Sequence, residues 1–287
     1  MPFRYSVFTV MMPEFDIPAS AALLQSLGYN GVEWRVHSVP SVFPDKPDFW
    51  RGNKSTIDIE TITEKAPEIK RISEDAGLEI IGLGTYLGYK LLDDVARCME
   101  AARLMDCPSI RVSAPNYDGS TNYNDLYEQA VDGYGQVENL ARDFGVRANI
   151  EIHHGSMCPS AGLTSRLVSN FDPDFIGVIY DPGNMVCEGY ERWQMGLDLL
   201  GPYLSHVHVK NAAWCESGVS ADGEKLWKHS MVATKDGSVN WPEVLLALDK
   251  AGYQGWLSFE DFGPGDTKTK LSGDLAYIKG LVDRLGI

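Results

Sequence analysis

The chain has 287 residues, of which 44% are hydrophobic and 23% charged, and this balance is typical of a soluble globular protein with a substantial core. The formal net charge is −15 and no basic run occurs, so binding to nucleic-acid phosphates is not expected. The sequence contains neither an apolar stretch long enough to span a membrane nor a secretory signal pattern. Five dispersed cysteines without a C-x-x-C pair favour reduced thiols and a cytoplasmic location.

Short β-branched stretches alternate with amphipathic stretches along the whole chain. Each amphipathic stretch ends at a glycine or a proline, the residues that most often end helices. The last segment, residues 274–286, is predicted to be a closing helix. The predicted strands lie at residues 4–12, 31–37, 78–84, 109–115, 147–154, 177–184, 204–211 and 255–262.

This alternation predicts an α/β fold with a parallel sheet, closed into a single (β/α)8 TIM barrel over residues 1–287. A doubly wound open sheet is the alternative fold. It is disfavoured because no glycine-rich phosphate loop follows the first predicted strand.

Two long insertions, residues 37–60 and 212–238, interrupt the regular pattern. Both follow the carboxyl end of a predicted strand, on the face where barrel enzymes build their active sites. We expect these loop insertions to form lids or substrate walls.

Polar side chains recur at alternate positions of the predicted strands, and alternate residues of a strand point to the same face. In the segment HVHVK, the side chains of His206, His208 and Lys210 therefore share one face, and two valines take the other. The apolar face must pack against helices, so the polar face lines the barrel interior. The same alternation predicts that further polar side chains point into the barrel: Glu33, Arg35, His37, Arg111, Ser113, Asn149, Glu151, His153, Asp181, Ser258 and Glu260.

Some of these positions have structural interpretations. His206 lies one layer below His208 and is expected to be a hydrogen-bonded core histidine. Glu33 is expected to form an ion pair with Arg35 or Arg111 inside the barrel. His154 falls on the outward face of its strand and is expected to be a loop residue.

Potential metal ligands end the last four predicted strands. Glu151, Asp181, His208 and Glu260 follow one another by about one strand–helix unit, and the last step also contains the insertion at 212–238. Such strands are neighbours in a barrel wall, so their ends meet at one mouth. Three carboxylates in contact repel one another unless a cation lies among them. This donor set suits Mn²⁺, Mg²⁺ or Co²⁺, with Zn²⁺ as a further candidate; an ion pair with arginine is the alternative for any single acid.

The segments NIEIHH, IYDPGN, HVHVKN and GYQGWLSFED resemble the motifs of the xylose isomerase-like TIM barrels, also described as sugar phosphate isomerases/epimerases. That family includes ketose 3-epimerases, hydroxypyruvate isomerase and inosose dehydratase. The resemblance implies that Glu151, Asp181, His208 and Glu260 bind a divalent metal, and that the two glutamates form an acid/base pair.

The chain departs from the epimerase pattern at two positions. Asn184 stands where the epimerases carry a histidine, and Trp214 stands where they carry an arginine. His153 and Lys210 look more like the dehydratase branch of the family.

The predicted function is that of a divalent-metal-dependent isomerase or epimerase acting on a sugar or keto-sugar. It would abstract a proton next to the carbonyl and proceed through an enediolate. The predicted catalytic residues are Glu151 and Glu260, with His153 or Lys210 as a base or acid that does not bind the metal. Mn²⁺ is the first candidate for the cofactor.

Other classes of function remain open from the sequence. A metal-dependent lyase would act on a keto-sugar, an inosose or a 3-keto-glycoside by β-elimination, with Lys210 or His153 protonating the leaving group. A metal-dependent endonuclease fits poorly with six histidines and the negative net charge. A non-catalytic carbohydrate-binding barrel would leave the acids without metal. The expected partner is a small carbohydrate, with neither nucleic acid nor membrane. Members of the resembled family often form dimers or tetramers, and the oligomeric state of this chain stays open.

Overall fold

A computed structural model describes residues 3–287 and shows a closed parallel barrel, which confirms the predicted (β/α)8 fold. The barrel strands follow the order β1-β11-β8-β7-β6-β5-β4-β2, and pairing of β1 with β2 closes the ring. The short strand β3 (Ile57–Asp58) adds to β2 in parallel. The barrel strands are β1 (Arg4–Phe8), β2 (Gly31–His37), β4 (Glu79–Gly84), β5 (Ser109–Arg111), β6 (Arg147–Glu151), β7 (Ile176–Tyr180), β8 (Leu204–Val209) and β11 (Trp256–Phe259).

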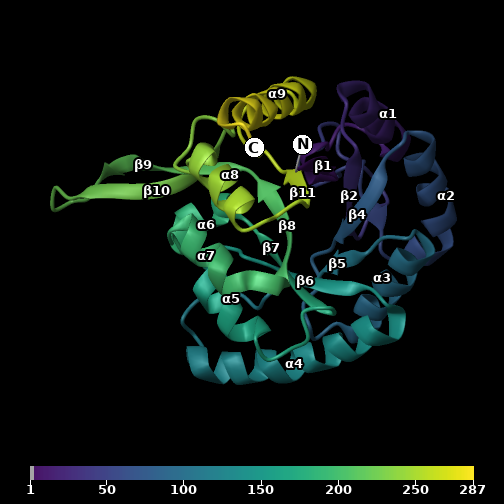
Figure 1. Cartoon of the computed structure of the whole chain (residues 1–287), viewed down its shortest axis with the longest axis horizontal. Coiled ribbons are helices and arrows are strands. Elements are labelled where there is room, and N and C mark those ends of the chain that lie inside the picture. Colours follow the sequence, from purple (N-terminus) through teal and green to yellow (C-terminus); the bar gives the residue numbers. More distant parts are fainter. Residues whose placement is uncertain (1–2) are drawn as a thin grey trace.

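Helices surround this ring of strands (Figure 1). Helix α1 begins after Asp16, whose side chain accepts a hydrogen bond from the backbone N–H of Ala19, and ends at Gly28, whose φ of 83° is left-handed. Single 3-10 turns, η1 (Thr9–Met11) and η2 (Gly201–Tyr203), flank β1 and β8. The helices are α1 (Ile17–Leu27), α2 (Ile62–Asp75), α3 (Leu92–Leu104), α4 (Tyr123–Phe144), α5 (Ala161–Val168), α6 (Pro182–Glu188), α7 (Trp193–Leu200), α8 (Trp241–Lys250) and α9 (Thr267–Leu285).

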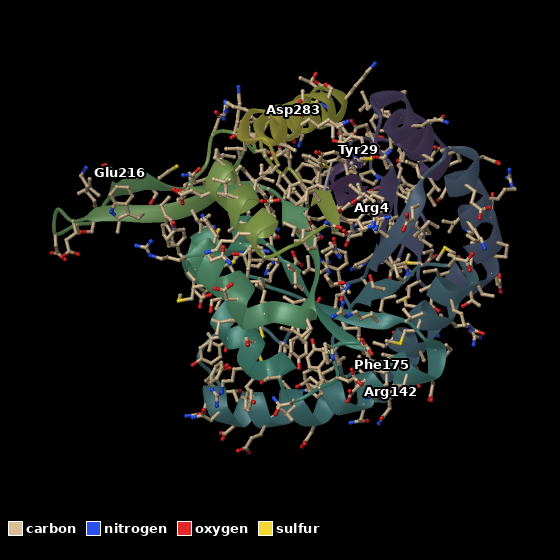
Figure 2. The ribbon with its side chains drawn as sticks, in the orientation of Figure 1. Arg4, Tyr29, Arg142, Phe175, Glu216 and Asp283 are labelled. Carbon is tan, nitrogen blue, oxygen red and sulfur yellow. The ribbon has the colours of Figure 1, made fainter. Side chains whose placement is uncertain are left out.

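The strand faces follow the predicted period of two. Trp34 on β2 is fully buried and its indole N–H donates to Ser73 Oγ of α2 at 3.1 Å, so this side chain points outward toward the helices. Its neighbour Glu33 points inward and contacts His208 of β8 across the barrel at 3.0 Å. Outside the barrel, Arg142 of α4 stacks on the ring of Phe175, 4.2 Å from its centroid (Figure 2). The apolar core therefore lies between strands and helices, and polar groups occupy the barrel axis.

The insertions take two different forms. Residues 38–56 contain neither helix nor strand and lead from β2 to β3. The segment 212–238, expected as a loop, contains most of an antiparallel hairpin of β9 (Asn211–Val219) and β10 (Lys225–Val232). The hairpin projects away from the barrel (Figure 1). Near its outer end Lys225 Nζ lies 2.8 Å from Glu216 Oε2, and Glu216 is labelled in Figure 2.

Two further features concern the whole chain. Among residues 3–287, no helix is both long enough and apolar enough to cross a membrane. All five cysteines carry free thiols, and Cys215 on the hairpin is the exposed one among them.

Candidate active site

The predicted ligands come together at the carboxyl-end mouth of the barrel. Glu151 ends β6, Asp181 follows β7, His208 lies in β8 and Glu260 follows β11, and these strands are consecutive neighbours in the sheet. Each residue offers one ligand atom, and these atoms all lie within 4.8 Å of one another. All four side chains are buried. The barrel register therefore converts four distant sequence positions into one cluster.

Local chain geometry fixes Asp181. The segment DPGN begins α6, with Asp181 as its N-cap: Asp181 Oδ1 accepts a hydrogen bond from the backbone N–H of Asn184 at 2.9 Å. Pro182 stands in the first helical turn, where its missing N–H leaves no bond unmade. This leaves Asp181 Oδ2 directed at the cluster, where Lys210 Nζ lies 2.8 Å from it.

The ammonium of Lys210 lies among the carboxylates. It is 2.7 Å from Glu260 Oε2 and 3.7 Å from Glu151 Oε1, and the side chain is almost fully buried. Burial alone would lower the pKa of Lys210, but Asp181, Glu260 and Glu151 outweigh it and raise the pKa above its usual value. The cluster therefore already surrounds one positive charge.

Arg111 neutralises the other side of Glu151. Its guanidinium donates to Glu151 Oε2 at 2.6 Å and to the carbonyl of Thr85 at 2.8 Å. Burial alone would raise the pKa of Glu151, but Arg111, His208 and Lys210 hold this pKa well below its ordinary value. Burial is likewise outweighed by Lys210 and His208 at Glu260, whose pKa is lowered. Both glutamates are therefore ionised at neutral pH.

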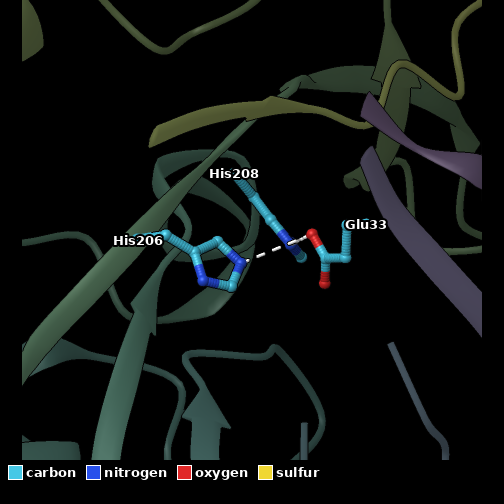
Figure 3. A group of neighbouring side chains, drawn as sticks. All are labelled: Glu33, His206 and His208. Carbon is cyan, nitrogen blue, oxygen red and sulfur yellow. Dashed lines mark hydrogen bonds and ion pairs between the residues drawn. The ribbon is translucent and has the colours of Figure 1, made fainter. Parts of the chain in front are cut away.

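A second polar group lies deeper along the barrel axis (Figure 3). Glu33 Oε2 lies 3.0 Å from His208 Nε2 and 3.4 Å from His206 Nε2, and it accepts a hydrogen bond from Ser258 Oγ at 2.9 Å. The expected ion pair of Glu33 with Arg35 or Arg111 is wrong. The strand period predicts that Glu33 points inward but does not predict which residue it contacts across the barrel. Arg111 instead forms an ion pair with Glu151.

The contacts of His208 define its chemistry. Its Nε2 lies against Glu33, while its Nδ1 lies 3.2 Å from Glu151, 3.5 Å from Glu260 and 3.6 Å from Asp181. Burial lowers its pKa, but Glu33 and Glu260 raise it well above the ordinary value. The raised pKa favours an imidazolium with protons on both ring nitrogens. Loss of the Nδ1 proton would leave Nε2–H donating to Glu33 and the lone pair of Nδ1 directed at the acid cluster.

Sequence reasoning missed the role of Asn184 and His154. The amide of Asn184 donates to Glu151 Oε1 at 3.2 Å and to Asp181 Oδ2 at 2.9 Å, so it ties two predicted ligands together. Its Oδ1 lies 2.9 Å from His154 Nδ1. His154 is half-buried, and burial together with His153 lowers its pKa. Strand β6 ends at Glu151, so the period of two no longer applies at His154.

His153, predicted as catalytic, lies at the rim of the site. The side chain is exposed, its ring stacks on His154 with centroids 4.6 Å apart, and its Nδ1 lies 2.6 Å from the carbonyl of His154. It does not contact the predicted ligands, but it lines the same cavity as Glu151, Glu260 and Lys210.

This cavity measures about 250 Å³ and opens over the acid cluster. Trp50 from the insertion at 37–60 forms part of its wall, whereas no residue of 212–238 lines it within the described chain. The hairpin instead packs on α6, where the indole N–H of Trp214 donates to the carbonyl of Val186 at 3.0 Å. The cavity is lined by Trp50, Tyr86, Arg111, Ser113, Ala114, Asn116, Glu151, His153, Ser156, Lys210, Glu260 and Phe262.

The donor set of the cluster fits a divalent cation. Three carboxylates and one imidazole nitrogen face a common point, and a protein ammonium is already held there by two of the acids at 2.7 and 2.8 Å. Hard or borderline divalent ions prefer such oxygen-rich sets with one nitrogen. The second group, Glu33, His206 and His208, also brings one potential ligand atom each within 4.8 Å.

Fold and site together define a class of protein: a (β/α)8 barrel with a buried cluster of acids and a histidine at its carboxyl-end mouth. Residues 21–281 match the family model of the xylose isomerase-like TIM barrels, and the chain belongs to that family.

The chain is similar in sequence to proteins named inosose dehydratase. Inosose dehydratase of Geobacillus thermodenitrificans (strain NG80-2) is 27% identical over 143 residues, which cover 47% of this chain and 46% of that protein. The matched region thus spans about half the length of this curated relative.

Solved structures share the whole fold at low sequence identity. The 3-keto-D-glucoside 4-epimerase from E. coli superposes with a TM-score of 0.72 at 14% identity, over 97% of this chain and 99% of that chain. The IOLI protein with a binding zinc atom gives a TM-score of 0.73 at 12% identity, over 99% and 98% of the two chains. At such identities the likeness shows the barrel architecture alone.

Proposed function

We propose that this protein is a divalent-metal-dependent isomerase or epimerase that removes a proton next to the carbonyl of a sugar or keto-sugar. The observation that carries the proposal is the convergence of Glu151, Asp181, His208 and Glu260, with ligand atoms within 4.8 Å of one another, beneath a cavity of about 250 Å³. The sugar- and cyclitol-directed activities named for similar proteins support the substrate class.

The four side chains of this cluster would hold the cation, with Mn²⁺ as the first ion to test. A divalent cation bound there would stabilise the negative charge that develops on substrate oxygens in an enediolate. Glu33 would keep His208 in the tautomer whose Nδ1 faces the cluster, since His208 Nε2 lies 3.0 Å from Glu33 Oε2.

Charged side chains of the cluster would supply the base and the proton donor for proton transfer. Glu151 and Glu260 have lowered pKa values, so they are present as carboxylates and can accept a proton from carbon. Lys210 has a raised pKa, so it is present as an ammonium and can donate. We assign the base to Glu260 or Glu151 and the proton donor to Lys210, with His153 as a further proton carrier at the cavity wall.

A lyase is the second candidate. A donor beside a base is what β-elimination requires: Glu260 would take the α-proton while Lys210, 2.7 Å from it, would protonate the departing hydroxyl or alkoxide. The curated relative named inosose dehydratase favours this outcome. Keto-sugars, inososes and 3-keto-glycosides are the corresponding substrates.

One experiment tests the proposal and separates the two candidates. The protein is incubated with Mn²⁺ and a panel of keto-sugars, inososes and 3-keto-glycosides in D₂O, and products are followed by NMR and ultraviolet absorbance. An isomerase or epimerase gives a deuterated product of unchanged composition, whereas a lyase gives an enone with new absorbance. Absence of both signals across the panel contradicts metal-assisted proton abstraction.

Matched variants assign the signal to the cluster. Glu260→Gln keeps the shape of the side chain but removes its basicity, and we expect it to abolish deuterium incorporation. Glu100→Gln, an exposed glutamate on α3, is the control and should retain the wild-type rate.

A further inference from the structure

A second, larger cavity adjoins the acid-lined one. It measures about 590 Å³ and is built mainly from residues of the insertion at 37–60. Trp50 lines both cavities, so they meet at its indole ring. The larger cavity is lined by Arg35, His37, Ser38, Val39, Pro40, Val42, Phe43, Pro44, Trp50, Arg51, Gly52, Asn53 and Thr56.

The sizes of the two cavities suit two parts of one ligand. Pockets for drug-sized molecules have volumes of about 300–1,000 Å³. The acid-lined cavity, at about 250 Å³, has room for a small ring, whereas the cavity of about 590 Å³ can take a second group of similar or larger size. The Trp50 indole is packed against the ring of Phe262, with centroids 5.3 Å apart, which holds the residue that the two cavities share.

The lining of the larger cavity indicates the chemistry of its occupant. Most of the surface that lines it is apolar, with Val42 and Phe43 among the side chains that supply it, and apolar surface leaves sugar hydroxyls without partners. Two guanidinium groups, of Arg35 and Arg51, also line it, and guanidinium groups stack favourably on aromatic rings. An aromatic ring matches this combination better than a second sugar does.

Arg35 adds a specific hydrogen-bond donor. The side chain is 4% exposed, its terminal nitrogen donates to Thr56 Oγ1 at 2.5 Å, and it stacks on Tyr86, 5.1 Å from the ring centroid. Its Nε is buried and has no hydrogen-bond partner among residues 3–287. Buried donors normally have a partner, so an acceptor on a bound ligand is a candidate partner for this N–H.

We infer that the substrate is an aryl glycoside in its keto form, with the sugar ring in the acid-lined cavity and an oxygen-bearing aromatic aglycone in the cavity beyond Trp50. This inference rests on the proposed function and specifies its substrate class. The glycosidic oxygen joins the two rings where the cavities meet, and an oxygen substituent of the aglycone accepts from Arg35 Nε. The insertion at 37–60 is then the part of the chain that selects the aglycone.

Binding measurements test this inference without turnover. The Mn²⁺-loaded protein is titrated calorimetrically with methyl β-D-glucopyranoside, 4-hydroxyphenyl β-D-glucopyranoside and cellobiose. We expect the aryl glucoside to bind about tenfold more tightly than the methyl glucoside, because a buried aromatic ring adds stacking and apolar contact. Cellobiose should show no such gain. Equal affinity for the methyl and aryl glucosides, binding of neither, or a gain for cellobiose alone would overturn the inference.

Variants locate the effect in the larger cavity. Phe43→Ala should remove most of the advantage of the aryl glucoside and leave the affinity for the methyl glucoside within about twofold. Trp227→Ala is the control, because Trp227 is also an exposed aromatic residue and lines neither cavity. A loss of affinity for the aryl glucoside in Trp227→Ala, but not in Phe43→Ala, would contradict the placement of the aglycone in the larger cavity.

The two proposals can fail separately. If deuterium exchange occurs but the aryl glucoside binds no more tightly than the methyl glucoside, the proposed aglycone site is wrong and the proposed enzymatic function still stands. If the aryl glucoside binds in a way that depends on Phe43 but no keto-sugar exchanges deuterium, the proposed binding site stands and the proposed enzymatic function is wrong.

Discussion

At the residue scale, the site is a cluster of buried charges that stabilise one another. Glu151 and Glu260 are each at least 95% buried, where an isolated carboxylate would be protonated rather than charged. They remain ionised because Arg111 and Lys210 lie within 2.6 and 2.7 Å of their respective oxygens. Each charge in this cluster is therefore held by its neighbours, and removing one leaves another unpaired.

Glu33→Gln tests whether the deeper carboxylate supports the predicted metal ligand. Glu33 Oε2 lies 3.0 Å from His208 Nε2, and a carboxylate behind a ligating histidine fixes its tautomer. We expect Glu33→Gln to weaken Co²⁺ binding about 10–100-fold, measured by absorbance titration. Ser258→Ala is the control, because it removes one hydrogen bond to Glu33 but keeps the carboxylate beside His208. Unchanged affinity in Glu33→Gln would exclude the supporting role.

At the element scale, the turns that follow the strands decide where side chains point. The turn from β7 into α6 brings the backbone of Gly183 against Lys210: a Cβ on Gly183 would overlap Lys210 Cγ and lie 3.0 Å from its carbonyl oxygen. The same turn directs Asp181 Oδ2 toward the ammonium of Lys210 at 2.8 Å. Helix α6 and strand β8 thus hold this ion pair through close backbone approach.

Gly183→Ala should displace Lys210 from the acid cluster. We expect a loss of stability of about 1–3 kcal/mol by urea unfolding, together with loss of activity in the deuterium-exchange assay. Gly280→Ala in α9 is the matched control: Gly280 is exposed and helical, and a Cβ added there would meet no other part of the chain within 4 Å, so alanine should stabilise by about 0.5–1 kcal/mol. Equal effects of both substitutions would refute the packing argument.

The closing helix carries a pH-sensitive acid. Burial and the neighbouring Asp261 raise the pKa of Asp274 on α9 to about 7 from an ordinary value of 3.8. The folded state therefore opposes the ionisation of Asp274. The resulting loss of folding stability is absent below pH 3.8, grows between pH 3.8 and pH 7, and is complete above pH 7. Asp274→Asn should be more stable than wild type by roughly 1–3 kcal/mol at pH 8, with a smaller difference at pH 5.

Urea unfolding at pH 5 and pH 8 measures this difference. The control is Asp249→Asn at the exposed end of α8, which should leave the pH dependence of wild type unchanged. A pH-independent effect of Asp274→Asn would show that Asp274 does not titrate between these values.

At the scale of the whole molecule, closure of the barrel is what assembles the site. The sheet order places β6, β7, β8 and β11 side by side, and β2 faces β8 across the axis through the contact of Glu33 with His208. Acids from different strands thereby share arginine, lysine and histidine partners. The stability of the molecule should then depend on the ionisation of these acids.

Acid unfolding tests this dependence. The lowered pKa values of Glu151 and Glu260 contribute stability that is present above their ordinary value of 4.5 and is lost as pH falls through the folded values. At pH 6, Glu151→Gln should be less stable than wild type by about 3–5 kcal/mol, because it leaves Arg111 unpaired. This difference should shrink as the pH falls below 4.5, as measured by urea unfolding. A constant difference would contradict the assigned ionisation.

The sequence by itself determined the strands, their inward faces and the three acids and one imidazole at the ends of the last four strands. These features follow from local rules, because the strand period of two and the repeat of strand and helix are set by neighbouring residues. The loop at residues 212–238 was the exception, since most of it pairs as a hairpin.

Only the tertiary structure decided which polar groups meet. Glu33 lies between two histidines, Arg111 binds Glu151, and Asn184 joins Glu151 to Asp181 and His154. These partners come from different strands and turns, so they depend on barrel register and on where each strand ends, which the period along one strand does not specify. The cavity beyond Trp50 likewise depends on the fold of the irregular segment 38–56, which supplies most of its lining residues.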